Sequence, residues 1–315
     1  MIDYSIFYRN SYQDSNDLPH YDIFISAYNS SERVQNVYDN VKANRKIWLI
    51  HPEYLYTDLE IPIGTDIVAP KIEEKDEVSQ VNKLISCLGN IENLNICIDI
   101  TGFMRHVLVF LIVKLKHMNI NIFSAIYSEP GSYSKDEQTE FSTTTSELVK
   151  TIAGISADVE SDFKNHLIIN VGYDHKIINQ VTSHLDNAIV HPLFSFPSLS
   201  ADMYQQSASR AALSGEVTKK DEWISNRKFS PANNPFATAQ VISDLTAELD
   251  IENNNKNNFY LSPLSTKAQT LGFAIYWALE GHTRDISILL PECLTYSRET
   301  SKGLKRLWLY TVELT

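Results

Sequence analysis

The sequence predicts an α/β protein with two Rossmann-like, mostly parallel sheets, formed by a pseudo-repeat of β-α units. Three observations predict this class. Short apolar runs alternate with segments of helical period, the alternation starts again near the middle of the chain, and polar residues or glycine end most of the runs. The chain has 315 residues, which is enough for two lobes, expected over residues 1–160 and 161–315.

In the first half, apolar runs rich in β-branched and aromatic residues predict four strands. They are expected over 21–28, 46–50, 94–100 and 120–127. Segments with apolar residues three and four positions apart predict helices over 31–41, 77–88 and 103–118. Strands that alternate with helices should form a parallel sheet that is covered on both faces.

The second half repeats this alternation. Its strands are expected over 166–171, 187–196, 258–261 and 286–290, and its helices over 176–185, 203–213, 237–249 and 266–279. The region 128–162, which is rich in Ser, Thr and acidic residues, is expected to connect the two lobes. The alternating segment 306–314 is expected to add an edge strand.

Composition restricts the possible functions. The formal net charge of −12 disfavours an extended nucleic-acid surface, although a local basic pocket can still bind a small anion. The three cysteines form neither a C-x-x-C pair nor a disulfide framework. No apolar segment resembles a signal peptide or is long enough for a membrane span, so a cytoplasmic protein is expected. The nine histidines lack metal-binding spacing, and no metal site or cofactor is assigned.

One strand–helix junction is the clearest candidate site. Residues 95–115 read NICIDITGFMRHVLVFLIVKL, an apolar strand that ends on Asp99 and Thr101, turns at Gly102 and enters a helix behind Arg105. Asp99 or Thr101 could cap this helix. In open α/β sheets, however, ligands also bind where strands end and helices begin. The free N–H groups of a helix N-terminus, together with an arginine, favour an anion such as phosphate.

Further candidate ligand residues follow other strands. In the second half, Ser265, Thr266 and Lys267 occupy a junction that matches the first one. The turn formed by Gly172, Tyr173 and Asp174 follows the first strand of that half, and a turn with a helix N-cap is the alternative reading. Glu129 ends the fourth strand and could line the same cleft, or could belong to a turn before Pro130.

The first 130 residues resemble CARF domains, the Rossmann-like nucleotide sensors of bacterial antiviral systems. Asp99-x-Thr101-x-x-x-Arg105 fits the pattern D-x-[ST]-x-x-x-[RK] at the strand–helix junction of that family. The other ligand-binding segment of the family ends its first strand, which here reads SAYNSSER over 26–33 and includes Tyr28 and Asn29. The resemblance implies a sensor that binds a cyclic nucleotide or an oligonucleotide. Such a sensor acts on a separate effector protein and could form a homodimer.

Two other functions are compatible with the sequence. The opening YDIFIS over 21–26 is similar to the first strand of TIR domains, some of which cleave NAD with a glutamate. Glu53 or Glu129 could take that role in a nucleotide-consuming enzyme. The second alternative is a protein-interaction scaffold that binds no small ligand.

Overall fold

A computed structural model of the chain has the predicted α/β class. The structure describes residues 1–64, 66–133, 142–185, 187–213, 215, 218, 221–284, 286–298 and 301–315. The chain forms two compact units, which we call the N-terminal unit (residues 7–144 and 293–315) and the C-terminal unit (residues 1–6 and 145–292). Each unit holds one mostly parallel sheet with helices between its strands, which confirms the two-sheet architecture.

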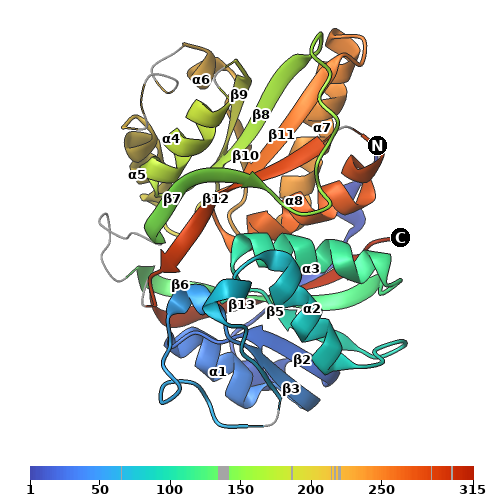
Figure 1. The fold of residues 1–315 in the computed structure, drawn as a ribbon, viewed down its shortest axis with the longest axis vertical. Helices are drawn as coiled ribbons and strands as arrows, with labels where there is room; N and C mark the ends of the chain where they lie inside the picture. The colour runs from blue at the N-terminus through green and yellow to red at the C-terminus, as the bar shows by residue number, and fades with distance from the viewer. Residues whose placement is uncertain are drawn as a thin grey trace. The chain divides into compact units, whose positions relative to one another are not determined.

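The sheet of the N-terminal unit has the strand order β1-β13-β6-β5-β2-β3-β4. Its strands are β1 (Arg9–Tyr12), β2 (Tyr21–Ala27), β3 (Ala43–Leu49), β4 (Ile67–Val68), β5 (Ile96–Asp99), β6 (Ile122–Tyr133) and β13 (Ser301–Glu313). Its helices are α1 (Glu32–Asn40), α2 (Glu77–Leu88) and α3 (Arg105–His117), with short 3₁₀ turns at η2 (Ser15–Asp17), η3 (Pro52–Tyr54) and η4 (Ile72–Glu74). Helix α1 buries Val37 against Phe24 and Cys97 on one face of the sheet. Helices α2 and α3 pack side by side (Figure 1).

The sheet of the C-terminal unit has the strand order β10-β9-β8-β11-β12-β7. Its strands are β7 (Ser142–Thr151), β8 (Lys164–Val171), β9 (Ile189–Ser195), β10 (Lys228–Ser230), β11 (Asn257–Pro263) and β12 (Ile286–Tyr296). Its helices are α4 (His175–His184), α5 (Met203–Ala211), α6 (Asp221–Ser225), α7 (Pro235–Glu252) and α8 (Lys267–Leu279), with 3₁₀ turns at η1 (Tyr4–Ile6) and η7 (Gly281–Thr283). Helices α4 and α5 contact β8, whereas α7 and α8 pack together beside β11 (Figure 1).

The two sheets share one topology around a central strand. In the N-terminal unit, β2 pairs in parallel with β3 on one side and with β5 on the other. In the C-terminal unit, β8 pairs in the same way with β9 and with β11. The strand order therefore reverses between β2 and β5 and again between β8 and β11. At such switch points, open α/β sheets bind ligands beyond the carboxyl ends of their strands.

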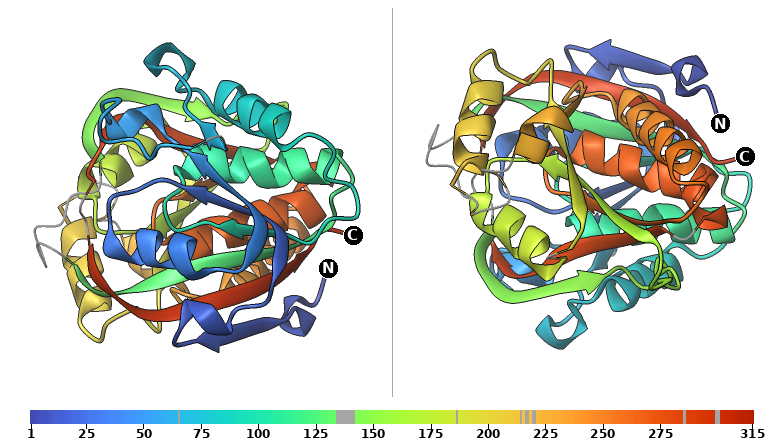
Figure 2. Two further views of the ribbon diagram at one scale, coloured as in Figure 1. Left: turned by 90° about the horizontal axis from the view of Figure 1, so that it is seen from below. Right: turned by 90° about the horizontal axis from the view of Figure 1, so that it is seen from above.

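The last strand differs from its prediction. The segment 306–314 was expected to form an edge strand of the second lobe, but β13 pairs antiparallel with β6 in the N-terminal unit. Strand β1 lies outside β13 and occupies the edge (Figure 2). The division at residue 160 therefore separates β13 from the sheet to which it belongs. Alternating hydrophobicity identifies a half-buried strand but not its partner.

The predicted connection over 128–162 also contains more structure than expected. Strand β6 continues to Tyr133, and β7 covers Ser142–Thr151. The run of threonines over 143–145 favours a strand because its side chains are β-branched, although its polarity resembles that of a loop.

Candidate functional site

The carboxylate of Asp99 lies at the switch point of the N-terminal unit and joins the ends of two strands. Asp99 is 0% exposed. Its Oδ2 accepts a hydrogen bond from the Ser26 hydroxyl at 3.0 Å, and its Oδ1 accepts from the Thr101 N–H at 3.0 Å. Burial raises the pKa of Asp99, while the hydrogen bonds from Thr101 and Ser26 and the charge of Arg33 act in the opposite direction. Asp99 therefore holds β2, β5 and the following turn together.

The next two candidate residues also connect neighbouring strands. Thr101 is 5% exposed, and its hydroxyl accepts a hydrogen bond from the Ser128 N–H on β6 at 2.9 Å. A Cβ at Gly102 would lie 2.2 Å from the Ala27 carbonyl oxygen, so only glycine allows the turn to approach β2 this closely. The Tyr54 hydroxyl donates to the Gly102 carbonyl oxygen at 3.2 Å. Thr101 and Gly102 thus form the base of the site.

Neither Asp99 nor Thr101 caps helix α3, so that alternative reading of the junction is wrong. The N-cap is Met104, and its N–H donates to His51 Nε2 at 3.1 Å. Because Nε2 accepts this bond, the proton of neutral His51 lies on Nδ1, which donates to Gln80 Oε1 at 2.6 Å. A buried histidine from beyond β3 therefore satisfies the N–H of the N-cap residue, as the glutamate of a capping box does.

Two arginines bring positive charge to this junction. Arg33 lies in the first turn of α1, and its Nη1 donates to the Ser128 carbonyl oxygen. Arg105 is the first residue of α3 and is partly exposed. Burial raises the pKa of Tyr127, and the charges of Arg33 and Arg105 both lower it, which places the two guanidinium groups near the same phenol on β6.

Arg33 was not among the predicted ligand residues. It closes the SAYNSSER segment, and a cation in the first turn after the first strand was the signal that could have identified it. Arg33 Nε and Ser128 Oγ are buried and have no hydrogen-bond partner among the described residues. Buried polar groups normally have partners, so these two atoms are candidates for ligand contacts.

The predicted residues Tyr28 and Asn29 follow β2 and contact a loop above the strand ends. The Tyr28 ring packs edge-on against Trp48 and Tyr56, with ring centroids 5.3 and 5.0 Å away. The Tyr28 hydroxyl donates to the Glu60 carbonyl oxygen at 3.0 Å. Asn29 Oδ1 accepts from the Ser31 N–H at 2.8 Å, which shapes the entry into α1.

We call residues 52–60 the covering loop, because Tyr54 within it contacts Gly102. Arg298 holds this loop from the segment before β13. Its Nε donates to the Tyr54 carbonyl oxygen at 2.8 Å, its Nη1 pairs with a carboxylate oxygen of Glu60 at 2.6 Å, and its Nη2 donates to the Leu55 carbonyl oxygen. The guanidinium also lies 4.3 Å from the centre of the Tyr56 ring. One arginine thus makes contacts along most of the covering loop.

The two candidate catalytic glutamates are both buried and paired. Glu53 Oε1 contacts His106 Nε2 at 3.2 Å and accepts from Gln80 Nε2 at 3.3 Å. Glu129 pairs with Lys305 at 2.9 Å and accepts from Trp308 Nε1 at 2.8 Å, and both of these partners lie on β13. These contacts give both carboxylates a role in holding the fold.

The junction of the C-terminal unit is rich in hydroxyl groups. Thr266 caps α8, and its hydroxyl accepts from the Gln269 N–H at 3.2 Å. The Ser265 N–H donates to Asn170 Oδ1 at the end of β8 at 3.2 Å, and the Ser265 hydroxyl lies 3.1 Å from that of Ser195. Lys267 is partly exposed and is the first residue of α8, as Arg105 is of α3.

The turn after β8 completes this edge. A Cβ at Gly172 would lie 2.4 Å from the Leu264 carbonyl oxygen, so in each unit a glycine allows two loops to meet across the switch point. The Tyr173 hydroxyl donates to Gln206 Oε1 at 2.9 Å, and its ring lies under Arg210 at 5.2 Å. Asp174 is the N-cap of α4 and accepts from the Lys176 N–H at 3.1 Å, which confirms the turn and N-cap reading.

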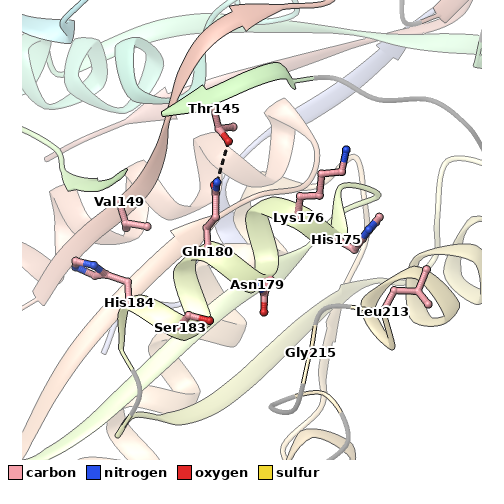
Figure 3. A pocket seen from close by; sticks show the side chains of 10 residues that line it. All are labelled: Thr145, Val149, His175, Lys176, Asn179, Gln180, Ser183, His184, Leu213 and Gly215. Carbon is pink, nitrogen blue, oxygen red and sulfur yellow. Dashed lines mark hydrogen bonds between the residues drawn. The ribbon is translucent and has the colours of Figure 1, made fainter. Parts of the chain in front are cut away.

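A cavity of about 700 Å³ lies beside α4 in the C-terminal unit. Its lining comes from α4, β7 and the segment after α5, and consists of Thr145, Val149, His175, Lys176, Asn179, Gln180, Ser183, His184, Leu213 and Gly215 (Figure 3). Gln180 Nε2 donates to the Thr145 hydroxyl at 2.8 Å across it. Its volume lies in the range of small-molecule sites. The described lining contains none of the predicted ligand residues.

Within the described part of the chain, no helix is long and apolar enough to cross a membrane. No group of three His, Cys, Asp or Glu side chains among the described residues is placed to hold a metal ion. No protein-family model matches the chain, and a comparison with curated proteins finds no match.

Proposed function

We propose that this protein is a nucleotide-binding sensor of a bacterial antiviral system, which binds a cyclic nucleotide or an oligonucleotide and acts on a separate effector protein. One observation carries the proposal. At the switch point of each unit, the strands end beside hydroxyl groups and the following helix begins with a cation, Arg105 or Lys267. A helix N-terminus and an adjacent cation together favour a phosphate group.

The chemistry of the N-terminal junction supports a phosphate ligand. The charges of Arg33 and Arg105 both lower the pKa of Tyr127, so two guanidinium groups bring positive charge to this phenol on β6. A phosphate oxygen would accept hydrogen bonds from Arg33 Nε and from Ser128 Oγ, which lack partners among the described residues. Asp99 would then act as a positioning residue, because both of its carboxylate oxygens hold backbone or hydroxyl groups of the strand ends.

The burial and pairing of Glu53 and Glu129 support binding over hydrolysis. An NAD-cleaving glutamate must reach its substrate, whereas Glu53 is held by His106 and Gln80 and Glu129 by Lys305 and Trp308. The sensor therefore remains the function we propose, with an effector as a separate chain.

Mass spectrometry of the small molecules released by denaturing the purified protein tests this function directly. We expect an intact nucleotide, which then serves as the ligand in calorimetric titrations. Arg105→Ala and Lys267→Ala should each weaken binding by about 1.5–3 kcal/mol, because each removes a charged hydrogen bond. Since both side chains are partly exposed, the melting temperature should change little.

Lys114→Ala is the matched control, since Lys114 lies on the same helix as Arg105 but in its last turn. It should leave binding unchanged. Unchanged affinity in both Arg105→Ala and Lys267→Ala, with the fold intact, would move the site elsewhere. Conversion of the nucleotide to products during incubation would instead favour an enzyme.

A further inference from the structure

We infer that the C-terminal unit binds the base of the nucleotide by stacking on three aromatic side chains, Phe196, Tyr204 and Phe229, which we call the aromatic surface. The inference rests on the proposed nucleotide-binding function. It goes further because it assigns the base of the ligand to a group of aromatic rings at the ends of β9 and β10.

The three rings form one group, in which Tyr204 is partly buried and the two phenylalanines are exposed. Phe196 is 57% exposed and Phe229 is 44% exposed. Ring centroids lie 5.9 Å apart for Phe196 and Tyr204, 6.3 Å for Phe196 and Phe229, and 5.8 Å for Tyr204 and Phe229. Isolated exposed apolar residues are common, whereas a contiguous exposed group on a folded protein usually marks a binding surface.

Buried contacts hold the aromatic surface in place. Phe194 is buried and packs against Tyr204 and Phe229, with centroid distances of 5.5 and 6.3 Å. The Phe196 N–H donates to the Ser230 carbonyl oxygen at 2.8 Å, which ties the end of β9 to the end of β10. Rings that are already ordered lose little conformational entropy when a ligand binds.

The surface adjoins the proposed phosphate site through a set of hydrogen bonds. Phe196 directly follows Ser195, whose hydroxyl donates to Gln269 Oε1 at 2.8 Å. Phe229 directly precedes Ser230, whose hydroxyl accepts from Gln269 Nε2 at 3.0 Å. Gln269 lies in the first turn of α8, two residues after Lys267. Because successive side chains of a strand point to opposite faces, Ser195 and Ser230 face α8 whereas Phe194 and Phe229 face α5. The two faces meet at the strand ends, where the Ser195 hydroxyl lies 3.1 Å from that of Ser265, and a ligand that contacts both the aromatic surface and the start of α8 would cross these ends.

A cation borders the aromatic surface. Arg227 Nη1 donates to the Tyr204 hydroxyl at 3.3 Å, and its Nε donates to the Ile224 carbonyl oxygen at 3.0 Å. Aromatic rings beside basic side chains are the arrangement with which proteins bind single-stranded nucleic acids, because every base presents a face for stacking. The chemistry therefore fits a nucleotide whose base stacks on Phe196 or Phe229 and whose phosphate meets a cation.

The test compares two probes that carry the same phosphates, a 5′-phosphorylated tetraadenylate and an abasic tetramer of the same length. In calorimetric titrations, the wild type should bind the tetraadenylate about tenfold or more tightly than the abasic tetramer. Phe196→Leu and Phe229→Leu should each weaken tetraadenylate binding about tenfold, because leucine keeps apolar volume but provides no ring. Both variants should bind the abasic tetramer as the wild type does.

Controls separate stacking from other effects. Phe196→Trp should keep the affinity for the tetraadenylate, and Ile224→Ala, which removes another exposed apolar side chain of this unit, should change nothing. Lys267→Ala should weaken the binding of both probes. Equal binding of the two probes, unchanged in the Phe→Leu variants but weakened in Lys267→Ala, would overturn the aromatic surface and leave the proposed function standing. Absence of binding by either probe would overturn both.

Discussion

At the scale of single residues, the Asp99 carboxylate resembles a ligand-binding group in the sequence, but in the structure it connects strand ends. Asparagine can reproduce both of its hydrogen bonds, since Oδ1 can accept from the Thr101 N–H and Nδ2 can donate to the Ser26 hydroxyl. Asp99→Asn should therefore lie within about 1 kcal/mol of the wild type in the free energy of unfolding.

Asp99→Ala should cost about 2–4 kcal/mol, because it leaves the Thr101 N–H and the Ser26 hydroxyl buried without partners. Urea unfolding followed by circular dichroism measures both variants. An equal loss in Asp99→Asn and Asp99→Ala would mean that the negative charge itself is needed, with Arg33 as a cation that acts on it.

The pair of the buried Glu53 and the partly exposed His106 should make stability depend on pH. Burial lowers the pKa of His106, but the hydrogen bond and the charge of Glu53 raise it by more than burial lowers it. The pKa of His106 therefore lies above 6.5 in the folded state. Burial raises the pKa of Glu53, but His106 lowers it to below 4.5. The stabilisation is therefore complete between about pH 4.5 and 6.5 and is lost as the pH rises through the folded-state pKa of His106.

His106→Ala should destabilise the protein by about 3 kcal/mol at pH 6, where it leaves a buried carboxylate unpaired. The difference in the free energy of unfolding between His106→Ala and the wild type should be smaller at pH 9, where His106 of the wild type has lost its proton. Paired urea titrations at the two pH values measure this, and the comparison with wild type removes the contribution of His191, whose pKa burial lowers to about 4. A difference that does not change with pH would rule out the ion pair.

At the scale of structural elements, the covering loop depends on one side chain from a distant part of the chain. Arg298→Ala removes the hydrogen bonds to Tyr54, Leu55 and Glu60 and the contact with the Tyr56 ring. Amide hydrogen exchange over 52–60 should therefore accelerate about tenfold or more, since roughly 1.4 kcal/mol of local stability corresponds to tenfold in opening.

The melting temperature of Arg298→Ala should change little, because Leu55 and Glu60 are exposed and the buried Tyr54 is contacted through its backbone carbonyl oxygen. Arg9→Ala is a suitable control, since Arg9 lies over the Trp308 ring at 5.0 Å in the same unit. If exchange over 52–60 stays at the wild-type rate in Arg298→Ala, the loop must be held by its other contacts, such as those of Tyr28.

At the scale of the whole molecule, the N-terminal unit is assembled from two distant parts of the sequence. Strand β13 pairs with β6 from Ser301 to Glu313 and also carries β1 on its other side. A fragment of residues 7–144 should therefore lack cooperative unfolding, because an open β6 edge and apolar residues such as Phe24 and Ile126 lose their cover from Leu307 and Leu309.

Adding a peptide of residues 293–315 to this fragment should restore a cooperative urea transition, whereas a peptide of the same composition in scrambled order should not. Far-ultraviolet circular dichroism and urea titration measure the transition. A fragment 7–144 that unfolds cooperatively by itself would show that β13 is an addition to a complete sheet.

Much of the fold could be predicted because its signals are local. Helix α2 begins and ends where its apolar spacing and the preceding Asp76 predict, and the starts of α3 and α8 lie within two residues of the prediction. The junction at Asp99 was found from the change of an apolar strand into a turn and a helix. Arg33 was missed as a candidate because its relation to Tyr127 and Ser128 depends on a strand almost one hundred residues away.

The sequence by itself determined the α/β class, the two series of β-α units and the positions of their junctions, because the period of apolar residues specifies which side chains face a core. Only the tertiary structure decided which sheet β13 joins, that Asp99 is buried between two strands, and that the exposed Phe196 and Phe229 gather with Tyr204 into one aromatic surface. The physical reason is that strands of similar pattern compete for the same partners. Pairing and burial then depend on packing between residues far apart in the chain, which no local pattern encodes.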